Sequence, residues 1–355
     1  MVKSVSISGF CYICRIIVNR IYFFKMKKLI LLPVFLMLAC AHIVAQDITQ
    51  ARDASCPGEK ILLIEDKYPD MRIAVNFPAE MDSRKKTKIV FYALPNGNTI
   101  EWTAGKTISE GDDWHFDIQH IAAQTRFLRE NAAKYNYVTV YMMASKKSWG
   151  VWRTEHRQDS KDILPAVIAD ITSMFGRYRP SVTLSSHSGG GYFIFEYIRT
   201  QDRIPDTVER IVFLDSTYGY EDSLHLKKLA DWLSRSKKHF LNVTSYQDST
   251  VVYNGKPLVS PHGGTWWRSK HMQTGLSDFF RFEKKEDGQF LNFYSPAGRA
   301  VFKLKKNPDG EIFHTVLVER NGFIDTMLSG TGYQGRGYVF WGPRAYTDLI
   351  CEEPL

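Results

Sequence analysis

One short segment of the chain has the residue types that nucleophilic catalysis needs. Leu184–Gly191 reads LSSHSGGG and joins a predicted strand directly to a predicted helix. A serine on a tight strand-to-helix turn exposes its hydroxyl, and this turn requires small residues two places before and two places after the serine. Ser186 and Gly190 occupy those places around Ser188. The pattern therefore predicts Ser188 as a nucleophile.

The same turn supplies a group that can stabilise negative charge. The N–H of Gly189, at the start of the helix, can point at a developing oxyanion, and the helix dipole favours negative charge there. The alternatives are a glycine-rich turn without catalysis and a phosphate cradle. The G-x-G-x-x-G and Walker spacings are both absent. The small flanking residues favour a catalytic turn.

With these residues, the chain resembles the α/β-hydrolase superfamily of serine esterases, lipases and peptidases, without a specific subfamily. The resemblance covers most of the mature chain in the order of its elements, and the turn around Ser188 is its specific motif. Ser186 stands where this family more commonly has glycine. The resemblance implies that an acid and then a histidine follow Ser188 along the chain, and that two N–H groups hold the oxyanion.

A serine hydroxyl needs a base that takes its proton. Five histidines follow Ser188, and His225 and His239, in a predicted helix and at the start of a predicted strand, are interpreted as structural. His314 lies late in the chain after a turn, as the family's base does, and is the predicted base. His262 is the runner-up, with a plain loop residue as its alternative interpretation.

Two aspartates end predicted strands and are candidates for the acid that orients the histidine. The family more often takes this acid from the later strand, which favours Asp248 and leaves Asp215 as the alternative. Capping of the following loop is the non-catalytic interpretation of either residue.

The second oxyanion donor is expected after the first strand of the parallel sheet, in Leu94-Pro95-Asn96. Proline has no N–H, so Leu94 or Asn96 would have to donate. We choose Asn96. A simple Asn-Gly turn is the alternative.

Aromatic residues gather in several predicted loops, and exposed indole faces suit sugar rings or aromatic acyl groups. Packing under long loops is the alternative for each of them. Further clusters lie at Trp102 and at residues 112–115. The predicted substrate-binding residues are Trp149, Trp152, Trp266 and Trp267.

No metal signature is present, since His-Glu-x-x-His is absent, and hydrolysis through a serine needs no cofactor. The long, loop-like segment 249–298 is expected to form a lid or cap over the site.

Strands and helices alternate along the mature chain, which predicts one α/β domain over residues 46–355 with a mostly parallel sheet and helices on both faces. In such sheets the site lies outside the carboxyl ends of the strands. The predicted strands are Lys60–Glu65, Met71–Phe77, Lys88–Leu94, Tyr137–Met143, Val182–Ser186, Arg210–Leu214 and His239–Ser245. The predicted helices are Ile118–Tyr135, Ser160–Tyr178, Gly190–Arg199 and Ser223–Ser236.

The N-terminal residues predict export. Met26-Lys27-Lys28 precedes an apolar run from Leu29 to Ala39, which matches a signal peptide over residues 26–45. A lipoprotein signal with Cys40 as the lipid-bearing residue is the second interpretation, and only lipidation would bring the protein to a membrane. Residues 1–25 are interpreted as an upstream extension that is not translated.

Charge and cysteine content fit a periplasmic or extracellular protein. Residues 1–45 hold six basic residues and no acidic one, so 40 basic face 38 acidic residues in the rest, which gives no reason to expect nucleic acid as a partner. Only Cys56 and Cys351 remain in the mature chain, and an oxidising compartment predicts a disulfide between them.

The sequence therefore predicts an exported serine hydrolase. It would cleave a small-molecule or glycan-linked carboxylic ester through an acyl-enzyme on Ser188. A serine peptidase on the same fold and a non-catalytic glycan-binding protein are the alternatives. The oligomeric state is left open.

Overall fold

The computed structural model describes residues 48–355. The predicted extension over residues 1–25, the signal peptide over residues 26–45 and the candidate lipid site Cys40 lie outside the described residues. The described helices include none that is both long and apolar enough to span a lipid bilayer.

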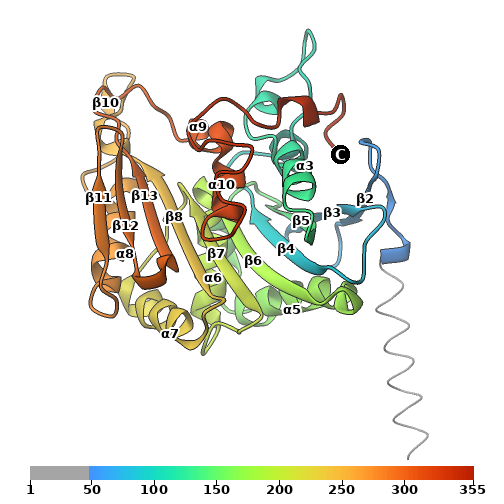
Figure 1. Ribbon diagram of the computed structural model, residues 1–355, viewed down its shortest axis with the longest axis horizontal. Coiled ribbons are helices and arrows are strands. Elements are labelled where there is room, and N and C mark those ends of the chain that lie inside the picture. The colour runs from blue at the N-terminus through green and yellow to red at the C-terminus, as the bar shows by residue number, and fades with distance from the viewer. Residues whose placement is uncertain (1–47) are drawn as a thin grey trace, which may run out of the picture. The chain divides into compact units, whose positions relative to one another are not determined.

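Within residues 48–355, eleven strands form one sheet in the order β1-β2-β3-β5-β4-β6-β7-β8-β13-β12-β11 (Figure 1). β9 and β10 form a separate hairpin. The strands are β1 Arg52–Asp53, β2 Glu59–Ile64, β3 Met71–Pro78, β4 Lys86–Ala93, β5 Tyr135–Ala144, β6 Pro180–His187, β7 Val208–Leu214, β8 Phe240–Tyr246, β9 Val252–Tyr253, β10 Lys256–Pro257, β11 Glu283–Glu286, β12 Phe290–Tyr294 and β13 Ala300–Lys305.

The centre of the sheet is parallel and both ends are antiparallel. β5, β4, β6, β7, β8 and β13 pair in parallel with their neighbours. β1, β2 and β3 on one side and β12 and β11 on the other pair antiparallel. The mostly parallel sheet that the sequence predicts therefore holds only for the six central strands. The sequence predicts no strand in residues 283–294, where hairpin connections reverse the chain and form β11 and β12.

Helices cover both faces of the sheet, which confirms the predicted α/β class. α3 and α10 lie in front of the sheet in Figure 1, and α5, α6 and α7 lie behind it. The helices are α2 Ile100–Ala104, α3 Ile121–Asn131, α4 Trp149–Glu155, α5 Ser160–Met174, α6 Gly191–Thr200, α7 Lys227–Arg235, α8 Thr265–Leu276, α9 Thr315–Leu317 and α10 Phe323–Leu328.

The central strand β4 shows why both faces are covered. Its residues from Ile89 to Ala93 are fully buried. Successive side chains of a strand point to opposite faces, so a continuous apolar run needs a packed layer on each side. Val90 and Tyr92 belong to the core cluster that includes Phe127 of α3 and Phe323 of α10. The intervening residues therefore face the opposite layer of helices.

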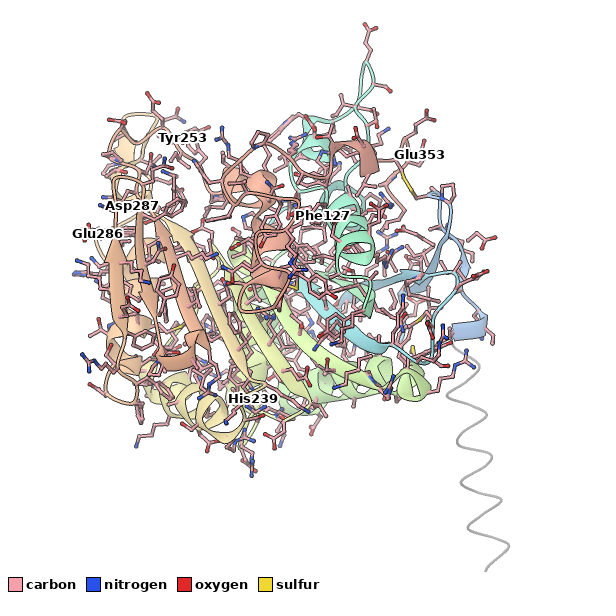
Figure 2. All side chains as sticks on the ribbon, viewed as in Figure 1. Phe127, His239, Tyr253, Glu286, Asp287 and Glu353 are labelled. Carbon is pink, nitrogen blue, oxygen red and sulfur yellow. A yellow bond between two sulfur atoms is a disulfide. The ribbon has the colours of Figure 1, made fainter. Side chains whose placement is uncertain are left out.

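The expected lid over residues 249–298 is a wrong prediction for most of this segment. Thr265–Leu276 forms helix α8, which packs on β8, and Glu283–Glu286 and Phe290–Tyr294 extend the sheet as β11 and β12. Only the part before α8, with the exposed β9–β10 hairpin, stands apart from the sheet, and Tyr253 marks it in Figure 2.

The predicted disulfide is confirmed. Cys56 and Cys351 are bonded, with their Cα atoms 6.0 Å apart and a sequence separation of 295 residues (Figure 2). The hydroxyl of Ser55 also donates to the carbonyl of Leu355 at 2.6 Å. Both contacts fix the last residues beside the first strands.

Candidate active site

Ser188 lies directly after β6, at the carboxyl end of a central parallel strand. Its backbone has a φ of 51°, in the left-handed region that residues other than glycine rarely adopt. His187 before it and Gly189 after it are buried, whereas Ser188 itself is only half-buried. Strained backbone of this kind persists only where the surrounding structure enforces it, and such strain is concentrated at functional sites. The turn therefore leaves Ser188 partly accessible to solvent, as a nucleophile requires.

The residues around the turn are small because the backbone of neighbouring strands comes very close. A Cβ at Gly190 would overlap the carbonyl oxygen of Ala93, and a Cβ at Gly191 would overlap that of Ser216. Ser186 is accommodated because its hydroxyl shares a hydrogen bond of 2.7 Å with the hydroxyl of Ser216. This contact explains how serine replaces the commoner glycine at position 186.

The two predicted oxyanion residues lie against each other. A Cβ at Gly189 would overlap the side chain of Asn96, so Asn96 sits directly over the turn. Gly189 is in the first turn of a helical segment, where N–H groups have no partner within the helix. The N–H of Leu94 is bonded to the carbonyl of Met142 at 3.0 Å, which removes Leu94 as a donor. The geometry thus brings Asn96 and Gly189 together.

His314 follows β13 and precedes α9, at the same end of the sheet as Ser188. Its ring centroid lies 5.2 Å from that of His187, the residue next to Ser188. Burial lowers the pKa of His314, which favours the neutral imidazole that a general base needs. Among the described residues, no hydrogen bond joins His314 to Ser188, Asp215 or Asp248. Such bonds are often long before substrate binds.

The runner-up His262 lies elsewhere. It is exposed, in the loop before α8, and its ring centroid is 5.0 Å from that of Trp267. The ring of His187, by contrast, is fully buried, and neither of its nitrogens has a hydrogen-bond partner among the described residues. Burial, with His314 nearby, lowers the pKa of His187 well below the ordinary value. The imidazole of His187 is therefore expected to be uncharged and to pack beside the serine.

Both candidate acids are buried and close together. Asp215 follows β7 with a φ of 47°, and Asp248 follows β8. The hydroxyl of Thr265 is within hydrogen-bond distance of Asp215 Oδ1, and lies 3.2 Å from Asp248 Oδ2. Asp248 Oδ2 also accepts the backbone N–H of Thr265 at 2.6 Å. The second oxygen of each carboxyl group has no hydrogen-bond partner among the described residues.

Burial dominates the electrostatics of this pair. It raises the pKa of Asp215 well above the ordinary value, and the neighbouring charge of Asp248 raises it further, whereas hydrogen bonds with Thr265 and with the backbone of Tyr246 lower it. Burial also raises the pKa of Asp248, but backbone N–H groups of Thr265 and Trp266 act in the opposite direction. The two aspartates therefore differ in how well they hold a negative charge, and Asp248 holds it better.

The predicted substrate-binding tryptophans divide into two groups. Trp149 and Trp152 are each only 2% exposed, and their indole N–H groups donate to the carbonyls of Met142 and Pro69 at 3.3 and 3.1 Å. The structure places them in the packing of α4, so they offer no free face to a ligand. Trp266 and Trp267, at the start of α8, are half-buried.

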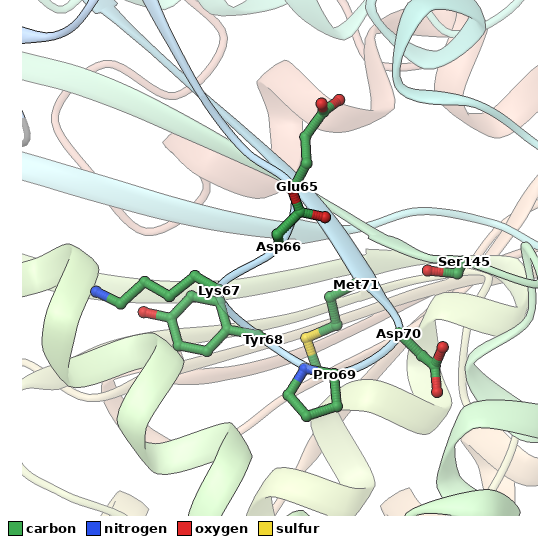
Figure 3. A pocket seen from close by; sticks show the side chains of 8 residues that line it. All are labelled: Glu65, Asp66, Lys67, Tyr68, Pro69, Asp70, Met71 and Ser145. Carbon is green, nitrogen blue, oxygen red and sulfur yellow. The ribbon is translucent and has the colours of Figure 1, made fainter.

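A pocket of about 390 Å³ lies beside the β2–β3 turn and contains none of the predicted catalytic residues (Figure 3). Its lining is mainly polar and charged, with Glu65, Asp66, Lys67 and Asp70 at its edge. β3 is three strands away from β6 in the sheet, which is about 14 Å at ordinary strand spacing. This pocket is therefore separate from the Ser188 turn.

Sequence reasoning missed Thr265. It lies in TWWRSKHMQTGL, a segment without an apolar helical stripe, and α8 was not predicted there. The preceding Gly263-Gly264 pair is the one signal available. A Cβ at Gly264 would overlap the carboxyl group of Asp248, so the glycine marks the close approach of the aspartate.

No family model matches the chain, and no curated protein matches it. Similar solved structures include a thermostable esterase, at 14% identity over 70% of this chain and 55% of that one, with a TM-score of 0.42. A mutant feruloyl esterase module from Clostridium thermocellum, complexed with sinapinate, is 13% identical over 73% of this chain and 87% of the module, with a TM-score of 0.41. An uncharacterised protein from Capnocytophaga ochracea is 10% identical over 78% of this chain and 66% of that one, with a TM-score of 0.44. Since these scores are below 0.5, we infer the function from the residues of this chain.

Proposed function

We propose that the chain is a serine esterase that hydrolyses a carboxylic ester through an acyl-enzyme on Ser188. The observation that carries this proposal is the left-handed backbone of Ser188, half-exposed on a turn whose neighbouring residues cannot be enlarged. A binding protein would gain nothing from holding a serine in this strained state. The proposal therefore ranks above the non-catalytic glycan-binding alternative.

The steps follow from the groups present. Ser188 Oγ attacks the ester carbonyl carbon while His314 takes the hydroxyl proton, and the N–H groups of Gly189 and Asn96 stabilise the oxyanion. His314 then gives the proton to the departing alkoxide, which leaves as an alcohol. In the second half, His314 takes a proton from water and the resulting hydroxide attacks the acyl carbon. His314 then returns this proton to Ser188 Oγ as the acyl–oxygen bond breaks, which releases the carboxylic acid and regenerates the serine.

The acid in this scheme is Asp248, with Asp215 kept protonated. A hydroxyl has one proton, so Thr265 can donate to only one of the two carboxyl groups within its reach. The other contact becomes a hydrogen bond only when that carboxyl group carries a proton and donates to Thr265. Asp248 accepts the backbone N–H of Thr265, so Asp248 takes the negative charge. It then offsets the positive charge that His314 acquires.

Labelling with a fluorophosphonate tests the proposal, because only an activated serine attacks the phosphorus centre. We expect one label, mapped by peptide mass spectrometry to Ser188, and none in Ser188→Ala. Assays with acyl esters against peptide substrates separate the esterase from the peptidase. An unlabelled, well-folded protein would support the binding-protein alternative.

Export is the second part of the proposal. The Cys56–Cys351 disulfide supports it, because disulfides persist in oxidising compartments outside the cytosol. The proposed substrate is a small-molecule or glycan-linked ester reached there, with lipidation at Cys40 as the proposed route to a membrane. Fractionation of the producing cell, with mass analysis of the mature N-terminus, tests both points.

A further inference from the structure

Three aromatic rings form a stack in the segment between β4 and α3. The ring of His115 lies 4.4 Å from Trp102 and 3.9 Å from Trp114, with interplanar angles of 15° and 28°. His115 is therefore sandwiched between the two indoles. Trp114 is 66% exposed, although tryptophan is highly buried on average. One large flat face at the end of this stack is open to solvent.

The stack is linked to the loop that contains Asn96, one of the two residues proposed to hold the oxyanion. Gln119 donates to the side chain of Asn98 at 3.3 Å, and Asn98 lies two residues after Asn96. The backbone N–H of Gly97 donates to the carbonyl of Lys147 at 2.9 Å, and the ammonium group of Lys147 lies 5.0 Å from the ring of Trp102. These contacts place the stack beside the residues proposed to hold the oxyanion.

The same segment is attached to the chain that follows His314. Arg344 pairs with Asp117, three residues after Trp114, and with Glu319 at 3.1 Å, five residues after His314. The segment that bears Trp114 thus contacts the loop that contains Asn96 on one side and, through Arg344, the chain that follows His314 on the other. A substrate that extends from Ser188 across this segment would meet Trp114.

We propose that Trp114 is a platform for a pyranose ring of the glycan that carries the ester. The apolar C–H face of a sugar stacks on an indole, while its hydroxyl groups need polar partners at the edge of the ring. Asp113 and Lys147 supply a carboxylate and an ammonium group around the stack. An aromatic acyl group would instead favour an apolar slot. This inference rests on the proposed esterase function and names its substrate class.

The test compares Trp114→Ala with the wild type and with a matched control, Phe279→Ala. Phe279 is also an exposed aromatic residue, at 49%, but it lies beyond the far end of α8. The substrates are acetylated xylo-oligosaccharides, acetylated manno-oligosaccharides, phenyl acetate and ethyl acetate. We expect Trp114→Ala to lower the oligosaccharide-to-ethyl-acetate ratio of kcat/KM by about three- to tenfold, mainly through KM. Trp114→Phe should restore most of this ratio, and Phe279→Ala should leave it unchanged.

Other outcomes have distinct meanings. A wild type that prefers phenyl acetate, and loses that preference in Trp114→Ala, would overturn the sugar platform in favour of an aryl site. An unchanged oligosaccharide ratio in Trp114→Ala would also overturn it, while leaving the esterase proposal intact. If no ester is cleaved and Ser188 is not labelled, the esterase proposal fails. The platform is then tested alone by titrating unacetylated oligosaccharides against the tryptophan fluorescence of the wild type and Trp114→Ala, and equal responses would refute it.

Discussion

The buried carboxyl groups of Asp215 and Asp248 reach the same hydroxyl group, that of Thr265. Each aspartate comes from the end of a different parallel strand, and each is nearly inaccessible to solvent. Two carboxylates in such a site cannot both stay ionised without a large cost. We therefore expect one of the two carboxyl groups to carry a proton, and mutation of each aspartate in turn tests their proposed roles.

We expect Asp248→Asn to lower kcat for ester hydrolysis by about 10³- to 10⁴-fold, because the charge that supports the imidazolium is lost. Asp215→Asn should stay within about tenfold of the wild type, since an amide resembles a protonated carboxyl group in size and hydrogen bonding. Steady-state kinetics with one acyl ester measure both, with circular dichroism as the folding control. A larger loss in Asp215→Asn than in Asp248→Asn would reverse the two roles.

Thr265→Val should impair both carboxyl groups, because it removes the hydroxyl between them while keeping a similar shape. The expected cost is about 1–3 kcal/mol of unfolding free energy, together with a fall in kcat. Thr265→Ser keeps the hydroxyl and should recover both quantities. Urea denaturation and kinetics of the two variants provide the comparison. Equal behaviour of the valine and serine variants would show that the hydroxyl has no such role.

The pH dependence of activity should follow the lowered pKa of His314. The base acts as neutral imidazole, so kcat/KM rises with pH as the imidazolium loses its proton. Half of the plateau should therefore be reached below about pH 6.5, the ordinary value for histidine. A profile of kcat/KM between pH 4 and 9 measures this, with circular dichroism at each pH to exclude unfolding. An acidic limb centred above pH 6.5 would contradict the assignment.

Gly191→Ala should destabilise the protein by about 2–4 kcal/mol and abolish labelling of Ser188, because the added carbon overlaps the carbonyl oxygen of Ser216. Gly176→Ala is the matched control, since no atom lies within 4 Å of its added carbon. Urea midpoints and fluorophosphonate labelling give the two readouts. Similar stability of both variants would mean that the turn is less closely packed than described.

Cys351→Ser should lower the unfolding free energy by about 2–5 kcal/mol, because the disulfide restricts nearly the whole domain in the unfolded state. A reductant should lower the melting temperature of the wild type and leave that of the variant unchanged. Thermal melts with and without dithiothreitol test this. A reductant effect that persists in Cys351→Ser would be incompatible with a bond to Cys56.

The strand-to-helix turn at Ser188 and the central strands were predictable because their signals are local. A buried strand such as β4 reads as an unbroken apolar run, and the small residues around Ser188 report a close backbone approach. The disulfide was predictable from the number of cysteines, because Cys351 is the one other cysteine in the predicted mature chain. For the turn and the strands, neighbouring residues carry the whole physical constraint, whereas the disulfide depends on the number of cysteines.

Other features depend on contacts between distant residues and leave no such pattern. β11 reads EKKE, with every side chain exposed, and becomes a strand only because β12 pairs with it. Trp149 and Trp152 look like loop aromatics in the sequence, yet Met142 and Pro69 accept their N–H groups inside the fold. The contacts of Thr265 with Asp215 and Asp248 join three segments of the chain, and no spacing in the sequence predicts these contacts.

The charged strand β11 is the edge strand at one side of the sheet. A strand in that place offers unpaired amide and carbonyl groups, and another chain could add to them as a further strand. The sequence Glu-Lys-Lys-Glu opposes this, since an incoming apolar strand would have to strip water from four ionised side chains. The charged edge strand thereby opposes strand-to-strand association between copies of this chain.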